Sequence, residues 1–228
     1  MIEDRSLTFG ELKELLRSVS MGKLESATEK VDGQQLSITY RDGALRAARN
    51  KGDIKQGGIN AKELASRFAG RGSVHDAFTK AFNVLEKAVA SLPPKQLRAA
   101  FRNGHFWHSI EIMYSGNRNV VNYDGDWITF HSTGTTAYDE NGDAADDPAS
   151  EAAWSALESS VESMQASIRD TNWNIVGPHY MQLKALSSNV PLKNALKLVS
   201  SAMDMHGYGT GADDGWTIGD YIDEAVDY

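Results

Sequence analysis

The sequence predicts an α+β fold in which an antiparallel sheet comes first and a mainly helical part follows. Two alternating apolar runs, 36–40 and 44–49, are separated by Arg41-Asp42-Gly43 and predict a hairpin. Further alternating runs predict three more strands, at 105–114, 119–123 and 127–131. The second half of the chain has apolar residues mainly at helical spacing, which completes the α+β pattern.

Helix start and stop signals fix the expected helices in chain order. Thr8 and Glu11 form a capping box before the first apolar stripe, and Asn60 with Glu63 gives a second capping signal. Pro93-Pro94 ends the long apolar helix that precedes it. The predicted helices are 8–19, 61–68, 73–89, 148–168, 191–199 and 217–226.

The composition is that of a globular chain. It has 228 residues and 41% apolar content, enough for a proper core. The absence of cysteine excludes disulfides and thiolate-metal sites and fits a reducing cytosol. No run approaches the ~20 apolar residues of a membrane span, and the N-terminus lacks a signal-peptide pattern. We therefore expect a cytoplasmic protein without a membrane partner, in the host cytoplasm if it is viral.

The net charge of −8 is unevenly distributed. Residues 1–135 hold 19 Lys and Arg against 15 Asp and Glu, whereas residues 136–228 hold 4 against 16. Eight basic residues between Arg41 and Arg71 leave room for a basic face, and an ordinary solvated surface is an equal alternative. We expect a core at 1–135, an acidic linker or loop at 136–150, and an acidic helical region at 151–228 that inserts in or extends the core.

One stretch before the first predicted strand indicates chemistry. It reads Glu29-Lys30-Val31-Asp32-Gly33, with Ser37-Ile38 following on the strand. Lys-x-Asp-Gly resembles the nucleotidyl-lysine motif of the covalent nucleotidyltransferases, the superfamily of ATP-dependent DNA and RNA ligases and mRNA capping enzymes. The pattern is most similar to the phage-type RNA-ligase branch. Many DNA ligases and capping enzymes carry an arginine five residues after the lysine, where this chain has Gln35.

The resemblance implies an adenylation domain of ligase type in which Lys30 attacks the α-phosphate of ATP. An exposed lysine, with a pKa near ~10.4, is almost fully protonated at neutral pH, so burial, cations or a metal must lower that pKa. Asp32 alone would raise it, and Gly33 lets the backbone pass close to the nucleotide. The resemblance assigns Glu29 to the adenine edge.

Later segments are similar to further elements of the same family. Arg49 matches the arginine that contacts the ribose or the phosphates. Glu111, on a strand that leads to Gly116, resembles the glutamate that contacts the ribose or helps to hold a metal. Trp127 and Phe130 are candidates for the aromatic that stacks on the purine, and a core role is equally open for either. A loose match to the fifth element makes Lys184 the lysine that neutralises the α-phosphate.

The resemblance implies an ATP- and Mg²⁺-dependent ligase that joins a 5′-phosphate to a 3′-hydroxyl, on RNA rather than DNA. Two alternatives stay open. The fourth family element is missing and the chain ends within a predicted helix, which fits either an N-terminal piece of a longer ligase or a divergent relative. Such a relative would bind a nucleotide or a protein without catalysis. A protein-modifying AMP transferase on the same scaffold is a third possibility.

Overall fold

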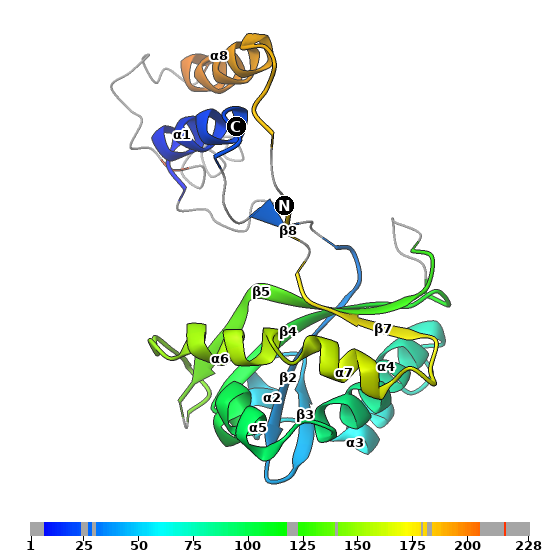
Figure 1. The fold of residues 1–228 in the computed structure, drawn as a ribbon. Coiled ribbons are helices and arrows are strands. Elements are labelled where there is room, and N and C mark those ends of the chain that lie inside the picture. The colour runs from blue at the N-terminus through cyan, green and yellow to red at the C-terminus, as the bar shows by residue number, and fades with distance from the viewer. Residues whose placement is uncertain are drawn as a thin grey trace. The chain divides into compact units, whose positions relative to one another are not determined.

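The computed structural model describes residues 7–23, 27–28, 31–117, 123–139, 141–178, 180–181, 184–205 and 217. Contacts within the chain divide it into two compact units. The larger unit is Glu29–His179, and the smaller combines Met1–Thr28 with Tyr180–Tyr228. Helices accompany a largely antiparallel sheet, so the predicted α+β class is confirmed at that level (Figure 1).

A six-stranded sheet organises the described part of the larger unit. Its order is β3-β2-β4-β5-β6, with antiparallel neighbours throughout, and β7 adds a parallel pairing to β5 (Figure 1). The strands are β2 (Gln34–Arg41), β3 (Ala44–Ala48), β4 (Phe106–Met113), β5 (Asp126–Tyr138), β6 (Ala144–Ala145) and β7 (Trp173–Val176).

The β2–β3 hairpin forms where its turn residues allow it. Asp42 and Gly43 both have positive φ, 52° and 79°, the combination that a tight two-residue hairpin turn requires. Tyr40 then pairs with Leu45 and Ile38 with Ala47 across the hairpin, all four on the core face. The local turn chemistry thus sets the register that places the end of β3 beside the start of β2.

Helices cover one face of this sheet. They share a single apolar core with the inward-facing strand residues Leu36, Ile38, Ile110, Ile112 and Phe130. The α-helices of the larger unit are α2 (Lys51–Lys55), α3 (Ala61–Arg67), α4 (Ser73–Ala90), α5 (Pro94–Phe101), α6 (Ser150–Glu158) and α7 (Val161–Ser167), and a 3-10 turn, η1, spans Arg102–Gly104.

The smaller unit pairs segments from the two ends of the chain. Its elements are α1 (Phe9–Ser20), β1 (Ala27–Thr28), β8 (Tyr180–Met181) and α8 (Val190–Met205). β1 and β8 pair antiparallel, and the backbone N–H of Leu186 donates to the carbonyl of Ser20 over 2.8 Å. The capping box predicted at Thr8 and Glu11 is present at the start of α1. Within the described part of the chain, no helix has both the length and the apolar character that a membrane crossing needs.

Most strands lie where local alternation predicts them, whereas short or non-local elements differ from the prediction. The predicted 148–168 helix is two helices, α6 and α7, and α5 begins at Pro94 just after the predicted stop. β7 carries no alternation signal long enough to predict. The predicted strand 119–123 and helix 217–226 fall almost entirely outside the described residues.

The segment 136–150, expected as an acidic linker or loop, contains an acidic turn between two paired strands. β5 continues to Tyr138, and β6 pairs with it through Tyr138↔Ala144 and Ala137↔Ala145. The acidic turn between them is closed by Asp139, whose carboxylate accepts the N–H groups of Asn141 and Asp143. This segment therefore belongs to the larger unit, and the observed units do not coincide with the expected limits 1–135 and 151–228.

Candidate functional site

The candidate site lies on the sheet face opposite the one that carries the main apolar core. Glu111 alternates with Ile110 and Ile112, both in the core, so its side chain points to the opposite face. It lies directly across from Gln35 on β2 and Thr129 on β5. The Glu111 side chain is only 15% exposed, which is low for a carboxylate and requires hydrogen-bond partners.

The Glu111 carboxylate is held from two sides. Its Oε1 accepts the backbone N–H of Gly33 at 2.9 Å, and its Oε2 lies 3.3 Å from Nε2 of His131. A Cβ on Gly33 would lie 2.6 Å from the carbonyl oxygen of Ile112 and 2.8 Å from Cγ of Glu111. Only a glycine therefore lets the chain before β2 pass this close to β4. This glycine belongs to the Lys-x-Asp-Gly stretch.

A second contact fixes the residue before this glycine. The backbone N–H of Asp32 donates to the hydroxyl of Tyr123 over 2.8 Å. Tyr123 precedes β5, so strands β4 and β5 together position the peptide groups of Asp32 and Gly33. Lys30 and Glu29, the other predicted members of this stretch, lie outside the described residues.

Arg49 lies at the end of β3, next to the start of β2. Its guanidinium stacks over the ring of Phe78, 5.1 Å from the centroid, and NH1 donates to the carbonyl oxygen of Gln35. Partial burial lowers the pKa of Arg49, the negative charge of Glu111 opposes that effect, and the positive charge of Arg71 adds to it. The guanidinium is thus an oriented cation within electrostatic reach of the Glu111 carboxylate.

Asp53 anchors the turn that carries Arg49. Its buried carboxylate accepts the backbone N–H of Arg49 at 2.8 Å and pairs with the guanidinium of Arg67. Burial alone would raise the pKa of Asp53, but the hydrogen bonds from Arg67 and the backbone outweigh burial and lower the pKa. Sequence reasoning missed Asp53, although the Asn50-x-x-Asp53 spacing of a helix cap was visible.

Two predicted site residues do not belong to this cluster. Phe130 is fully buried opposite Ile110 on the core face, which favours the core role that the sequence left open for it. Trp127 points to the Glu111 face, because it alternates with core residue Ile128, and it is partly exposed. Lys184 is exposed and belongs to the smaller unit, so it is not among the residues that the larger unit assembles.

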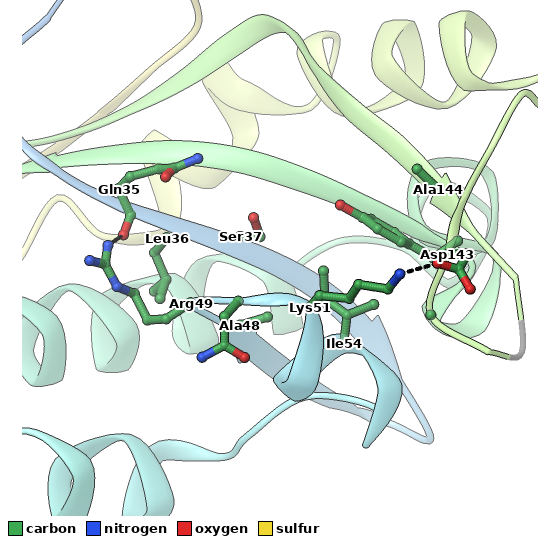
Figure 2. A pocket seen from close by; sticks show the side chains of 12 residues that line it. Gln35, Leu36, Ser37, Ala48, Arg49, Lys51, Ile54, Asp143 and Ala144 are labelled. Carbon is green, nitrogen blue, oxygen red and sulfur yellow. Dashed lines mark hydrogen bonds and ion pairs between the residues drawn. The ribbon is translucent and has the colours of Figure 1, made fainter. Parts of the chain in front are cut away.

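A pocket of about 430 Å³ opens on the same face, beside Gln35 and Ser37. Figure 2 shows Arg49 at one end of it and Lys51 reaching across its other end toward Asp143. The rest of the wall comes from α2 and the β5–β6 hairpin. Sequence reasoning missed this pocket because it treated the hairpin as a linker.

The site offers little for a metal ion by itself. Among the described residues, no group of three or more His, Asp or Glu side chains is close enough to bind one. Glu111 could supply one carboxylate. That fits Mg²⁺, which usually takes one or two protein carboxylates and fills its other positions with water and phosphate oxygens.

Comparison of the chain with protein-family models, with curated proteins and with solved structures gives no match.

Proposed function

We propose that this protein is an ATP-dependent nucleotidyltransferase of the polynucleotide-ligase type, acting on RNA through a covalent AMP on Lys30. The Glu111–Gly33 hydrogen bond carries this proposal. It joins residues 78 positions apart, and both were singled out from sequence as parts of one nucleotide site. Arg49 adds an oriented guanidinium at the same end of the sheet.

The proposed reaction has three steps, each of which transfers or displaces AMP. The unprotonated Lys30 amine attacks the α-phosphorus of ATP, an N–P bond forms and the nitrogen gives up a proton to solvent. The bond from the α-phosphorus to the bridging oxygen breaks, and pyrophosphate leaves. An RNA 5′-phosphate oxygen then attacks the same phosphorus, which releases the lysine and leaves AMP on the strand end. The 3′-hydroxyl of the end to be joined finally attacks the 5′-phosphorus of the strand that carries AMP. It loses its proton and displaces AMP. The protein contributes mainly positioning and charge neutralisation.

Each residue of the cluster has a defined part in that scheme. Arg49 binds phosphate oxygens through its guanidinium fork. Glu111 binds the ribose or one Mg²⁺ ion, and Mg²⁺ supplies neutralisation of phosphate charge. Gly33 and Asp32 present the backbone close to the nucleotide, with Trp127 as the remaining candidate for a base-stacking ring. The resemblance implies that Glu29 contacts the adenine edge, whereas Lys184 lies in the smaller unit and takes no part in the scheme.

The test is covalent labelling. Incubation with ATP labelled at the α-phosphate and Mg²⁺ is expected to leave label on the wild-type chain through a denaturing gel, with a mass gain of one AMP mapped to Lys30. Lys30→Ala is expected to remove the label, and the exposed lysine variant Lys23→Ala is the matched control that retains it. A blank wild-type lane contradicts the proposal. ATP binding without label would instead favour the non-catalytic nucleotide-binding relative.

The acceptor is tested with the labelled protein. A 5′-phosphorylated RNA oligonucleotide is expected to remove AMP from Lys30 faster than its 5′-hydroxyl counterpart or a DNA strand of the same sequence. Transfer to DNA alone would contradict the RNA assignment while leaving the lysine chemistry intact. Transfer only to a protein would favour a protein-modifying AMP transferase.

A further inference from the structure

The pocket beside Gln35 combines an apolar floor with a cationic rim. Ala48 and Ile54 contribute the apolar lining, and Arg49 and Lys51 contribute positive charge. Its volume of about 430 Å³ falls within the range of roughly 300–1,000 Å³ that is usual for small-ligand sites. Tyr138, from the end of β5, adds a partly exposed ring to the wall. Such a lining fits a ligand with a flat ring at one end and an anion at the other.

An internal carboxylate now occupies the position of that anion. The ammonium of Lys51 reaches across the pocket to pair with Asp143 (Figure 2). Both side chains are more than half exposed, and ion pairs of this kind contribute little to stability. A phosphate group carries more charge and more acceptor oxygens than a carboxylate. It would therefore compete well for Lys51.

More positive charge stands nearby than the pair alone provides. Lys55 lies against the hairpin turn, since a Cβ on Gly142 would lie 3.0 Å from its Cα. Hydrogen bonding and charge from Lys51, together with the charge of Lys55, lower the pKa of Asp143. Asp143 thus has two ammonium groups around it, and a guanidinium, Arg49, lines the same pocket.

Hydrogen bonds of Asp139 close the hairpin turn next to the pocket. The Asp139 carboxylate accepts the N–H of Asn141 at 2.9 Å and that of Asp143 at 2.8 Å, while the Asp139 N–H donates to the Asp143 carbonyl at 3.0 Å. None of these bonds uses the Asp143 side chain. That carboxylate can be replaced without opening the turn, and Lys51 is the partner that moves.

We propose that this pocket binds a 5′-phosphorylated nucleoside, with Lys51 on the phosphate in place of Asp143 and the ring of Tyr138 against the base. The ligand is a free nucleotide or the 5′-phosphate end of a strand, since both present the same group. The proposal does not rest on the lysine chemistry of the previous subsection, although Arg49 borders both sites.

Calorimetric titration of the full chain tests the proposal with AMP, adenosine, and an RNA tetranucleotide with or without a 5′-phosphate. We expect AMP to bind and adenosine to bind at least about tenfold more weakly, because charge-assisted bonds to the phosphate are lost. Tighter binding of the phosphorylated tetranucleotide than of AMP identifies a strand end as the ligand, and the reverse identifies a free nucleotide. Equal binding of the phosphorylated and unphosphorylated ligands overturns the proposal, as does no binding at all.

Matched variants assign the binding to this pocket. Lys51→Gln is expected to weaken AMP binding about tenfold, because it removes the cation that binds the phosphate. Asp143→Asn is expected to strengthen AMP binding about threefold, because it removes the carboxylate that competes for Lys51. Lys87→Gln and Asp170→Asn alter a similar exposed pair elsewhere, at 2.6 Å, and are expected to change nothing. Tyr138→Phe should retain binding that Tyr138→Ala loses.

The same variants separate this site from the one around Glu111. If Glu111→Gln abolishes AMP binding while Lys51→Gln behaves like Lys87→Gln, nucleotide binds only beside Glu111 and the present proposal falls. If the Lys51 and Asp143 effects persist in a Lys30→Ala chain that takes no covalent label, this pocket stands whether or not the ligase chemistry does.

Discussion

The two faces of the central sheet differ in the polarity and burial of their side chains. On one face the inward side chains of β2 and β4 are apolar apart from the buried His108, and helices close over them. On the other face the same strands carry Gln35, Ser37, Ser109 and Glu111 beside the buried Trp107 and Met113, and a pocket lies between them, α2 and the β5–β6 hairpin. Alternation along each strand makes this separation possible, because neighbours in sequence point to opposite faces.

The difference shows where stability and chemistry are located. The covered face provides the apolar burial that drives folding, and its tolerance for polar groups is limited to those that are fully hydrogen-bonded. On the open face, the nearly buried carboxylate of Glu111 and the close backbone approach at Gly33 each cost some of that stability. Substitutions on the two faces should therefore have different consequences.

The largest effect is expected from Phe130→Ala on the covered face. Phe130 has no exposed surface, so removal of its ring leaves a cavity and should lower the free energy of unfolding by about 3–5 kcal/mol. Trp127→Ala, three residues earlier on the open face, should cost less because Trp127 is already partly exposed. Urea unfolding followed by tryptophan fluorescence measures the loss of stability in Phe130→Ala. Labelling with ATP should decrease only in Trp127→Ala. A small loss of stability for Phe130→Ala together with lost ATP labelling would restore Phe130 as a stacking residue.

A slightly smaller effect is expected on acidification, through the one buried histidine of the covered face in the described part of the chain. His108 is fully buried, with its ring nitrogens 2.8 Å from Thr135 Oγ1 and 2.8 Å from the Ala100 carbonyl oxygen. Burial lowers the pKa of His108 from 6.5 to about 4, and the bond to Ala100 opposes this only partly. Between those values the unfolded chain binds a proton that the folded chain does not.

The contribution of neutral, buried His108 to the free energy of unfolding should therefore be fully present above pH 6.5. The free energy of unfolding should fall by about 3 kcal/mol as the pH drops to about 4. Urea unfolding at several pH values measures this slope. His108→Gln is the control: it should be less stable at pH 7 but should lose less stability between pH 6.5 and 4. A wild-type slope equal to that of His108→Gln would contradict a neutral buried imidazole.

Sequence reasoning found the open face in part, and the reason is physical. Glu111 was recognisable because a charge among apolar neighbours on a strand must point away from the core. Phe130 could not be placed, because its facing depends on the register between β4 and β5, which shifts at an irregularity between His108 and Ile110. His131 and Tyr123 were missed for the same reason: their partners are fixed by pairing between distant strands.

The pocket was unpredictable on other grounds. The acidic composition of 139–147 is typical of a solvated loop, and nothing in it announces that the Asp139 side chain will close a turn. The partner of Lys51 is 92 residues away, and such long-range ion pairs have no sequence signal. Turn residues thus predicted the β2–β3 hairpin, and the family resemblance pointed to Arg49. The arrangement that joins them depends on tertiary packing.

The smallest of the three effects on stability is expected at Gly33, which precedes β2 and contacts both Ile112 and Glu111 of β4. A methyl group there would lie 2.6 Å from the Ile112 carbonyl oxygen, and backbone atoms cannot yield as a flexible side chain can. Overpacking of this kind costs about 1–3 kcal/mol, which the fold should survive. The chain before β2 would have to move away from β4, however, and the 2.9 Å bond from Gly33 to Glu111 would lengthen or break. Gly33→Ala should thus lower ATP labelling far more than its loss of stability explains. Gly43→Ala is the control, because Gly43 has a positive φ but open space around it. This control should lose stability without any change in ATP labelling. Equal labelling by the two variants at matched stability would mean that the close approach of β2 to β4 has no part in the chemistry.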